Sequence, residues 1–320
     1  YAPPALFFGN DTTICEGSTY TLSGTRGGSA TGSTWTTSGS GTFDFPASLS
    51  ATYTPSGADI AVGSVTLTLT TNDPTGPCPA AADSMILTID LAATVNAGTD
   101  DSICEGSAYT LSGTIGGGAS SSTWTTSGTG TFNDSSLLAA IYTPSAADIA
   151  TGSVTLTLTT NDPPGLCTAI ADAMVLTINP AAIVNAGTDT TICEGSTYTL
   201  SGTRGGGATS STWSTLGTGT FNDTTLLSAT YTPSGADITM GSVTLIITTD
   251  NPSGPCTAAT DSMILTINIA ATVNAGVDDT ICSGFTYTLS GTRGGGATSS
   301  TWATSGTGTF NDSSLLAAIY

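Results

Sequence analysis

The sequence predicts an all-β protein made of tandem β-sandwich domains. The chain repeats itself every 89 residues, and a period of that length is close to the size of one small sandwich domain. Short runs that alternate apolar residues with Thr or Ser lie between clusters of Gly, Pro, Asn and Asp, which is the pattern of half-buried strands joined by turns. Helical periodicity is absent. The tryptophans show the repeat most plainly, at Trp35, Trp124, Trp213 and Trp302.

The repeat length divides the chain into four expected domains, at residues 1-91, 92-180, 181-269 and 270-320. The fourth is incomplete: the chain stops at Tyr320, in phase with Tyr142, and the last two strands of the repeat are missing. Two explanations stay open, a longer chain that has been cut and strand donation from a neighbouring subunit. Linkers are almost absent, because residues 178–184 run from the last strand of one domain into the first strand of the next. Such short joints favour an extended rod.

About seven short strands can be placed in order within the second repeat. The clearest is Val154–Leu158, where Val and Leu alternate with Thr as on a half-buried strand. Ser122–Thr126 directs Trp124 inward, so we expect all four tryptophans to lie in cores. Ala146–Ile149 is expected to be a turn. The remaining expected strands are Ala93–Val95, Ile103–Cys104 leading into Ala108–Ser112, Gly130–Phe132, Leu138–Tyr142 and Met174–Ile178.

The charge of the chain argues against several classes of function. There are 23 acidic residues, three arginines, no lysine and no histidine, and the net charge is -20. This charge repels phosphate backbones and anionic membrane surfaces, so we expect no nucleic-acid partner. The acidic residues lie in tight turns that recur in every repeat rather than flanking a cleft, so we expect no enzymatic activity. No stretch has the roughly 18 apolar residues needed to span a bilayer.

The cysteines occupy two fixed phases of the repeat. Their regular spacing predicts one disulfide within each full domain, and it leaves Cys282 unpaired in this chain. The alternative is a zinc site or a reactive thiol, which two cysteines per domain without histidine support poorly. Disulfides indicate an oxidising compartment, so we expect an extracellular or cell-surface protein. The expected pairs are Cys15–Cys78, Cys104–Cys167 and Cys193–Cys256.

The repeated phrase Val-Asn-Ala-Gly-x-Asp-x-x-Ile-Cys-Glu-Gly, followed by Trp and by Gly-Thr-Phe-Asn-Asp, resembles a known family. It is similar to tandem Ig-like or PKD-like repeats of large secreted surface proteins of Bacteroidota, including gliding-motility adhesins. The resemblance covers the chain beyond residue 8, and it implies export by the type IX system and a role in adhesion or surface structure. One departure favours a PKD-like variant. In immunoglobulin domains the disulfide joins the two sheets beside the buried tryptophan, whereas here the first cysteine precedes its strand and the second lies in the loop after Val154–Leu158.

Two kinds of candidate site follow. Acidic residues after the junction and in the loop of the second cysteine could bind calcium, as in many extracellular repeat rods, or could act only as turn residues. In the second repeat these are Asp100, Asp101, Glu105 and Asp162. Asp followed by Ser or Thr resembles the O-glycosylation site of Bacteroidota, although a chain so rich in Ser and Thr also matches by chance. The candidate acceptors are Ser84, Ser102, Thr190, Ser262 and Thr280.

Two functions are compatible with these features. The first is a structural or adhesive protein that forms a stiff rod, stalk or surface filament, with copies of itself or a cell-surface or glycan target as partners. The second is a module in which each repeat binds a glycan or partner through Trp or loop Tyr. Neither of these two functions requires a cofactor, and calcium at the acidic residues above is the one candidate. The exposure of the tryptophans discriminates between them, because buried indoles favour the structural role.

Overall fold

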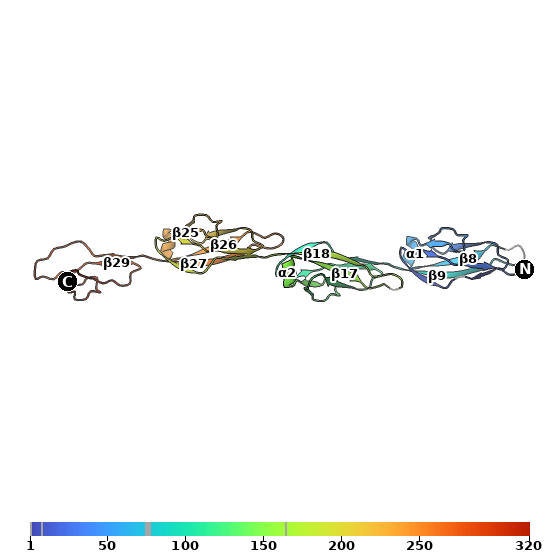
Figure 1. Ribbon diagram of the computed structural model, residues 1–320, viewed down its shortest axis with the longest axis horizontal. Coiled ribbons are helices and arrows are strands. Elements are labelled where there is room, and N and C mark those ends of the chain that lie inside the picture. The colour runs from blue at the N-terminus through green and yellow to red at the C-terminus, as the bar shows by residue number, and fades with distance from the viewer. Residues whose placement is uncertain (1, 8, 74–77, 164) are drawn as a thin grey trace. The chain divides into compact units, whose positions relative to one another are not determined.

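The computed structural model describes residues 2–7, 9–73, 78–163 and 165–320 of the chain. The chain divides into two compact units, Tyr1–Ile178 and Asn179–Tyr320. Almost all regular structure is β-strand (Figure 1), arranged in open sheets that repeat along the chain as Ig-like sandwiches, which confirms the predicted fold class. Among the described residues, no helix combines the length and the apolar character that crossing a bilayer requires.

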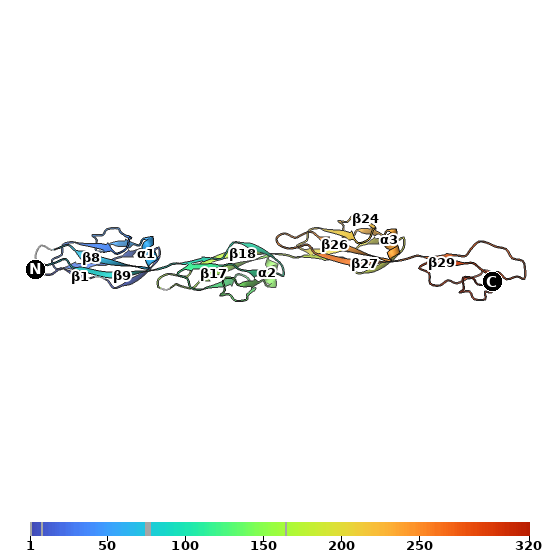
Figure 2. The same cartoon turned by 180° about the vertical axis from the view of Figure 1, so that it is seen from behind.

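Repeat 1 (residues 1-91) shows the arrangement that recurs in repeats 2 and 3 (Figure 2). A four-stranded sheet has the order β2-β9-β8-β5, a three-stranded sheet has the order β3-β7-β6, and β1 pairs with β4. All pairs are antiparallel except β2 and β9, which run parallel. The strands are β1 (Ala5–Phe7), β2 (Thr12–Cys15), β3 (Tyr20–Thr21), β4 (Thr25–Gly27), β5 (Ser33–Thr37), β6 (Thr42–Phe43), β7 (Thr52–Thr54), β8 (Ser64–Thr71) and β9 (Ala82–Asp90).

Repeats 2 (92-180) and 3 (181-269) contain the same strands in the same order. Those of repeat 2 are β10 (Ala93–Asn96), β11 (Asp101–Cys104), β12 (Tyr109–Thr110), β13 (Thr114–Gly117), β14 (Ser122–Thr126), β15 (Thr131–Phe132), β16 (Ile141–Thr143), β17 (Ser153–Thr160) and β18 (Ala171–Asn179). Those of repeat 3 are β19 (Ala182–Asn185), β20 (Thr190–Cys193), β21 (Tyr198–Thr199), β22 (Thr203–Gly206), β23 (Ser211–Thr215), β24 (Thr220–Phe221), β25 (Thr230–Thr232), β26 (Ser242–Thr249) and β27 (Thr260–Asn268).

The core of each sandwich is built on one buried tryptophan. In repeat 2, Trp124 lies opposite Leu158 in register, and the Phe132 and Tyr142 rings pack with centroids 5.1 Å apart. Along β17 every second residue is buried, because successive side chains of a strand point to opposite faces. The tryptophans of repeats 1 to 3 are each only 2% exposed, so burial of these aromatic residues contributes strongly to stability.

The predicted turn at Ala146–Ile149 is instead a six-residue helix, α2 (Ala146–Thr151). Its Ser145 hydroxyl accepts from the Asp148 amide while the Asp148 carboxylate accepts from the Ser145 amide, which forms a capping box. Repeats 1 and 3 carry the same helix as α1 (Gly57–Val62) and α3 (Gly235–Met240). The strand expected at Leu138–Tyr142 is shorter than predicted, because Leu138 lies in the preceding turn and only β16 pairs.

Repeat 4 (270-320) keeps little of this structure. Only β28 (Ala271–Asn274) and β29 (Thr292–Gly295) form strands among its residues. Trp302, expected in a core, is half-buried. The boundaries of the four domains stay a prediction.

Candidate functional site: a disulfide between neighbouring repeats

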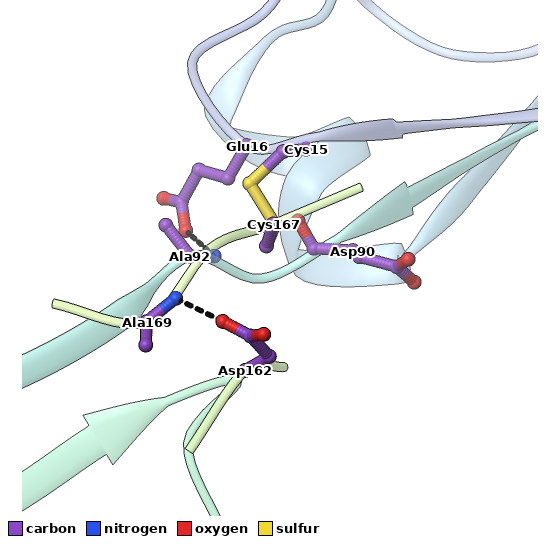
Figure 3. The surroundings of a disulfide bond; sticks show 7 residues. All are labelled: Cys15, Glu16, Asp90, Ala92, Asp162, Cys167 and Ala169. Atoms are coloured by element: carbon purple, nitrogen blue, oxygen red, sulfur yellow. Dashed lines mark hydrogen bonds between the residues drawn. A yellow bond between two sulfur atoms is a disulfide. The ribbon is translucent and has the colours of Figure 1, made fainter. Parts of the chain in front are cut away.

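A disulfide joins Cys15 of repeat 1 to Cys167 of repeat 2, with the two Cα atoms 5.0 Å apart (Figure 3). The predicted pairs within domains, Cys15–Cys78 and Cys104–Cys167, are therefore wrong. The predicted pair Cys193–Cys256 is also wrong, because Cys193 is a free thiol. The bonded cysteines occupy the two phases of the repeat that the sequence predicted, but the bond connects one repeat to the next.

The sheet topology explains why the bond crosses between repeats. Cys15 ends β2 and pairs in register with Asp90, the last residue of the parallel strand β9. Cys78 lies four residues before Ala82, the first residue of β9, and so beyond the other end of that nine-residue strand. At about 3.3 Å per residue the strand is roughly 30 Å long, so the two cysteines of repeat 1 lie near opposite ends of the sandwich, out of reach of a disulfide. The corresponding loop of repeat 2 instead meets the end of repeat 1 that carries Cys15 (Figure 3).

The remaining cysteines divide into two groups. Cys104 and Cys256 are disulfide-bonded. Cys256 Sγ lies 3.4 Å from the carbonyl oxygen of Asn179, the last residue of β18, as Cys167 Sγ lies 3.5 Å from that of Asp90. The free thiols are Cys78, which is half-buried, and Cys193 and Cys282, which are exposed.

The loop that carries Cys167 is shaped to approach repeat 1. Asp162 Oδ1 accepts a hydrogen bond from the Ala169 amide at 2.7 Å and closes the loop (Figure 3). Gly165 has a φ of +83°, and a Cβ at this position would collide with the Asp90 carboxylate of repeat 1. Only glycine combines this backbone conformation with so close an approach. The loop therefore fits the end of repeat 1 as well as bonding to it.

The glutamate that follows the first cysteine braces the same joint. The Glu16 amide donates to the Asp90 carbonyl at 2.8 Å. Glu16 Oε2 accepts from the Ala92 amide at 3.1 Å (Figure 3). Because β9 ends at Asp90 and the next strand begins at Ala93, these bonds hold the two-residue connection between the repeats. Glu194 accepts in the same way from the Ala270 amide at 3.0 Å.

The candidate calcium residues are used as hydrogen-bond acceptors within the fold. Asp100 Oδ1 accepts from a backbone amide of β18 at 2.8 Å, Asp101 Oδ2 accepts from the Tyr109 hydroxyl at 3.0 Å, and Asp162 closes its own loop. Glu105 also has an interaction partner. Within the described part of the chain, no group of three His, Cys, Asp or Glu side chains is placed to hold a metal ion. Calcium binding stays a prediction.

Four of the candidate glycosylation acceptors lie on strands and Thr280 lies in irregular chain, all outside the cores. Ser84, Ser262 and Thr280 are exposed, whereas Ser102 and Thr190 are half-buried. At Ser84 and Ser102 the preceding aspartate accepts a hydrogen bond from the acceptor residue's own amide, at 2.9 and 2.7 Å. This geometry gives the Asp-Ser sequence a structural role whether or not the hydroxyl is modified. Glycosylation stays a prediction.

Each of repeats 1 to 3 also contains a buried carboxylate that was not predicted from the sequence. Asp148, 3% exposed, accepts from the Tyr142 hydroxyl at 2.8 Å, from the Ser145 amide at 2.9 Å and from the Thr129 amide at 3.0 Å. A sequence signal existed, because Ser followed three residues later by an acidic residue is typical of a helix N-terminus. The equivalent residues in repeats 1 and 3 are Asp59 and Asp237.

The surroundings of these aspartates keep them ionised. Burial acts to raise the pKa of Asp148, but the donors of Ser145, Thr129 and Tyr142 outweigh it and lower that pKa from 3.8 to about 2. The same balance lowers the pKa of Asp59 to about 2. Burial also raises the pKa of Tyr142, which keeps its hydroxyl a donor. The network is a structural clamp between the helix and the second sheet, not a site of proton transfer.

No protein-family model and no curated protein matches the chain. Solved structures of tandem domains are similar to it at low identity. Titin domains I67–I69 (E-to-A variant) share 15% identity with a TM-score of 0.48, covering 84% of this chain and 99% of that one. Mouse cadherin-23 EC22–24 shares 13% with a TM-score of 0.39, covering 83% and 99%. Sidekick-1 immunoglobulin domains 1–5 share 14% with a TM-score of 0.35, covering 82% and 58%.

Proposed function

We propose that the protein is a non-enzymatic structural or adhesive repeat protein of the cell exterior, forming a stiff rod, stalk or surface filament. The observation that carries the proposal is the Cys15–Cys167 bond, which ties one repeat to its neighbour rather than bracing one domain internally. A bond in that position resists bending and separation at the joint, which a protein under load requires. The two-residue connections between β9 and β10 and between β18 and β19 support the same role.

The burial of the tryptophans favours this proposal over a glycan-binding module. Trp35, Trp124 and Trp213 are each 2% exposed, so their ring faces are not available to stack on a sugar. The joint also needs an oxidising environment to form its disulfide, which supports a location outside the cytoplasm. Secretion by the type IX system of a member of the Bacteroidota, and contact with further copies of the chain or with a cell-surface target, belong to the proposal through the sequence resemblance.

Electron microscopy of the whole chain before and after reduction tests the proposal. We expect the oxidised chain to appear as straight particles of uniform length, about 140 Å at roughly 35 Å per sandwich, and the reduced chain to bend at its joints. A chain lacking Cys15 and Cys104 through substitution by Ser is the matched control, and it should bend without reductant. Particles that are equally bent in both states would contradict a stiffening role.

Two subordinate proposals have tests of their own. If calcium binds near Asp100 and Asp162, calorimetric titration at millimolar calcium should release or absorb heat. A titration without heat would contradict the proposed calcium site. Glycosylation at Ser84 and Ser262 predicts an intact mass of native material above that of the polypeptide, and equality of the two masses would remove it.

A further inference from the structure

The loop that carries Cys167 contains an Asp-Pro peptide bond, between Asp162 and Pro163. An aspartate carboxyl can attack its own backbone carbonyl carbon through a five-membered ring, because both groups belong to one residue. Proline favours this reaction, because its tertiary amide nitrogen becomes a basic secondary amine when the bond breaks. The chain has one other such bond, between Asp73 and Pro74, and Pro74 lies outside the described residues.

The carbonyl group of the Asp162–Pro163 bond accepts a hydrogen bond from the preceding side chain. Asn161 Nδ2 donates to the Asp162 carbonyl oxygen at 3.0 Å. The Asn161 side chain is fixed in this position, because its Oδ1 accepts from the Ser120 amide at 3.0 Å and from the Ser121 amide at 2.9 Å. Negative charge develops on the carbonyl oxygen when its carbon is attacked. A donor that is already in place therefore stabilises the intermediate.

The attacking group and the leaving group are held differently. Asp162 is exposed, and its Oδ1 accepts from the Ala169 amide at 2.7 Å (Figure 3). Among the described residues no donor contacts Oδ2, so this oxygen is free to attack. Pro163 is buried and lies close to Gly118, where an added Cβ would come within 3.0 Å of Pro163 Cβ. One dipeptide thus combines a free carboxyl oxygen, a polarised carbonyl and a proline leaving group.

We propose that the chain cleaves itself between Asp162 and Pro163. Asp162 Oδ2 attacks the Asp162 carbonyl carbon, and the bond from that carbon to the Pro163 nitrogen breaks. The proton of the Asp162 carboxyl moves to this nitrogen, which leaves as a secondary amine, and residue 162 becomes a cyclic anhydride. Water then opens the anhydride to two carboxyl groups. The net change is the hydrolysis of one peptide bond, and water is the only other reactant.

The disulfide between repeats 1 and 2 determines what happens to the cut chain. Cys15 lies in fragment 1–162 and Cys167 lies in fragment 163–320, so their bond keeps the two fragments covalently joined. After cleavage, the covalent continuity of the chain depends on disulfides, which a reductant breaks. The inference goes beyond the proposed function and does not rest on it. A cut made once in each chain is compatible with a non-enzymatic rod whose repeats stay bonded.

Repeat 3 contains the same loop with the two side chains exchanged. Asp250 stands in the place of Asn161 and accepts from two backbone amides, both at 2.9 Å. Asn251 stands in the place of Asp162 and accepts from one backbone amide at 2.9 Å. The loop keeps these hydrogen bonds, but it has no amide donor for the carbonyl and no carboxyl directly before Pro252. We therefore expect the bond before Pro252 to stay intact.

Variants that carry the repeat 3 residues in repeat 2 test the proposal in the whole chain. Asn161→Asp keeps the acceptor and removes the donor, whereas Asp162→Asn removes the attacking carboxyl. The folded chains are incubated in one mildly acidic buffer, then reduced and analysed by mass spectrometry for fragments 1–162 and 163–320. We expect cleavage of the unaltered chain, cleavage slower by at least about tenfold with Asn161→Asp, and no cleavage at this bond with Asp162→Asn.

The reciprocal exchange in repeat 3 is the matched control. A chain that carries Asp250→Asn and Asn251→Asp should gain cleavage before Pro252. The unaltered chain, reduced and unfolded in urea in the same buffer, should cleave more slowly after Asp162, because Asn161 is no longer fixed. An unaltered chain that stays intact at this bond would overturn the proposal. So would equal rates with and without Asn161→Asp, equal rates in the folded and unfolded chains, or a repeat 3 exchange without cleavage.

Discussion

Pulling the chain from its two ends gives a direct reading of the joint between repeats 1 and 2. In a chain carrying Cys104→Ser and Cys256→Ser, the bond between Cys15 and Cys167 closes a loop of sequence separation 152. The residues inside that loop cannot be extended by force until the bond is broken. At about 3.5 Å per extended residue, the bond therefore hides roughly 530 Å of contour length.

Single-molecule force spectroscopy compares this chain with one that also carries Cys15→Ser. We expect full unfolding of the second chain to be longer by about 530 Å, whereas adding Cys78→Ser in place of Cys15→Ser should change nothing. A Cys15–Cys78 bond within repeat 1 would instead give a gain near 220 Å with either substitution, and that result would contradict a bond between repeats 1 and 2. The two possible gains in length, about 530 Å and about 220 Å, differ by far more than the length of one sandwich.

Three further predictions concern the clamp and the joint. Asp148→Ala leaves the buried Tyr142 hydroxyl without its carboxylate acceptor. Hydrogen exchange in β18 should therefore speed up by the equivalent of about 1–3 kcal/mol, with repeats 1 and 3 as internal controls. Unchanged protection would contradict the role of the clamp. Folding lowers the pKa of Asp59 and Asp148 to about 2, so the stability that these carboxylates contribute is nearly complete above about pH 4 and is lost as the pH falls toward 2. The free energy of unfolding, measured by urea titration, should therefore drop over that range by about 2 kcal/mol per group. A flat profile would count against this contribution. Gly165→Ala should weaken the disulfide, measured by glutathione titration, because the added methyl group would collide with Asp90 of repeat 1. The matched control is Gly106→Ala, since Gly106 has a similar positive φ but no neighbour within 4 Å, and Gly165→Ala should cost about 1–3 kcal/mol more than this control. Equal effects would show that the approach to repeat 1 is not tight.

Much of the sandwich was predictable because each strand carries its own signal. The alternation of Val154–Leu158 predicted β17, and Ser122–Thr126 coincides with β14. The short helix α2 was missed because six residues are too few to show a 3.6-residue period, although Ser145 and Asp148 form a recognisable capping box. Local sequence preferences therefore predict a single helix or strand and its caps, and no more than that.

The joint could not be predicted from spacing alone. A cysteine that recurs once per repeat is compatible with a partner in its own repeat or in the next, because both choices repeat with the same period. What decides between them is the parallel pairing of β2 with β9, which places Cys15 at the end of the sandwich away from Cys78. That pairing is a contact between strands far apart in sequence, and the alternation of apolar residues within each strand carries no information about it.

The most direct test of the joint is a disulfide map of the unreduced 320-residue chain by mass spectrometry. We expect a peptide that links Cys15 to Cys167, with Cys78, Cys193 and Cys282 recovered as alkylated thiols. A peptide that links Cys15 to Cys78 would contradict it, and with it the claim that neighbouring repeats are covalently joined.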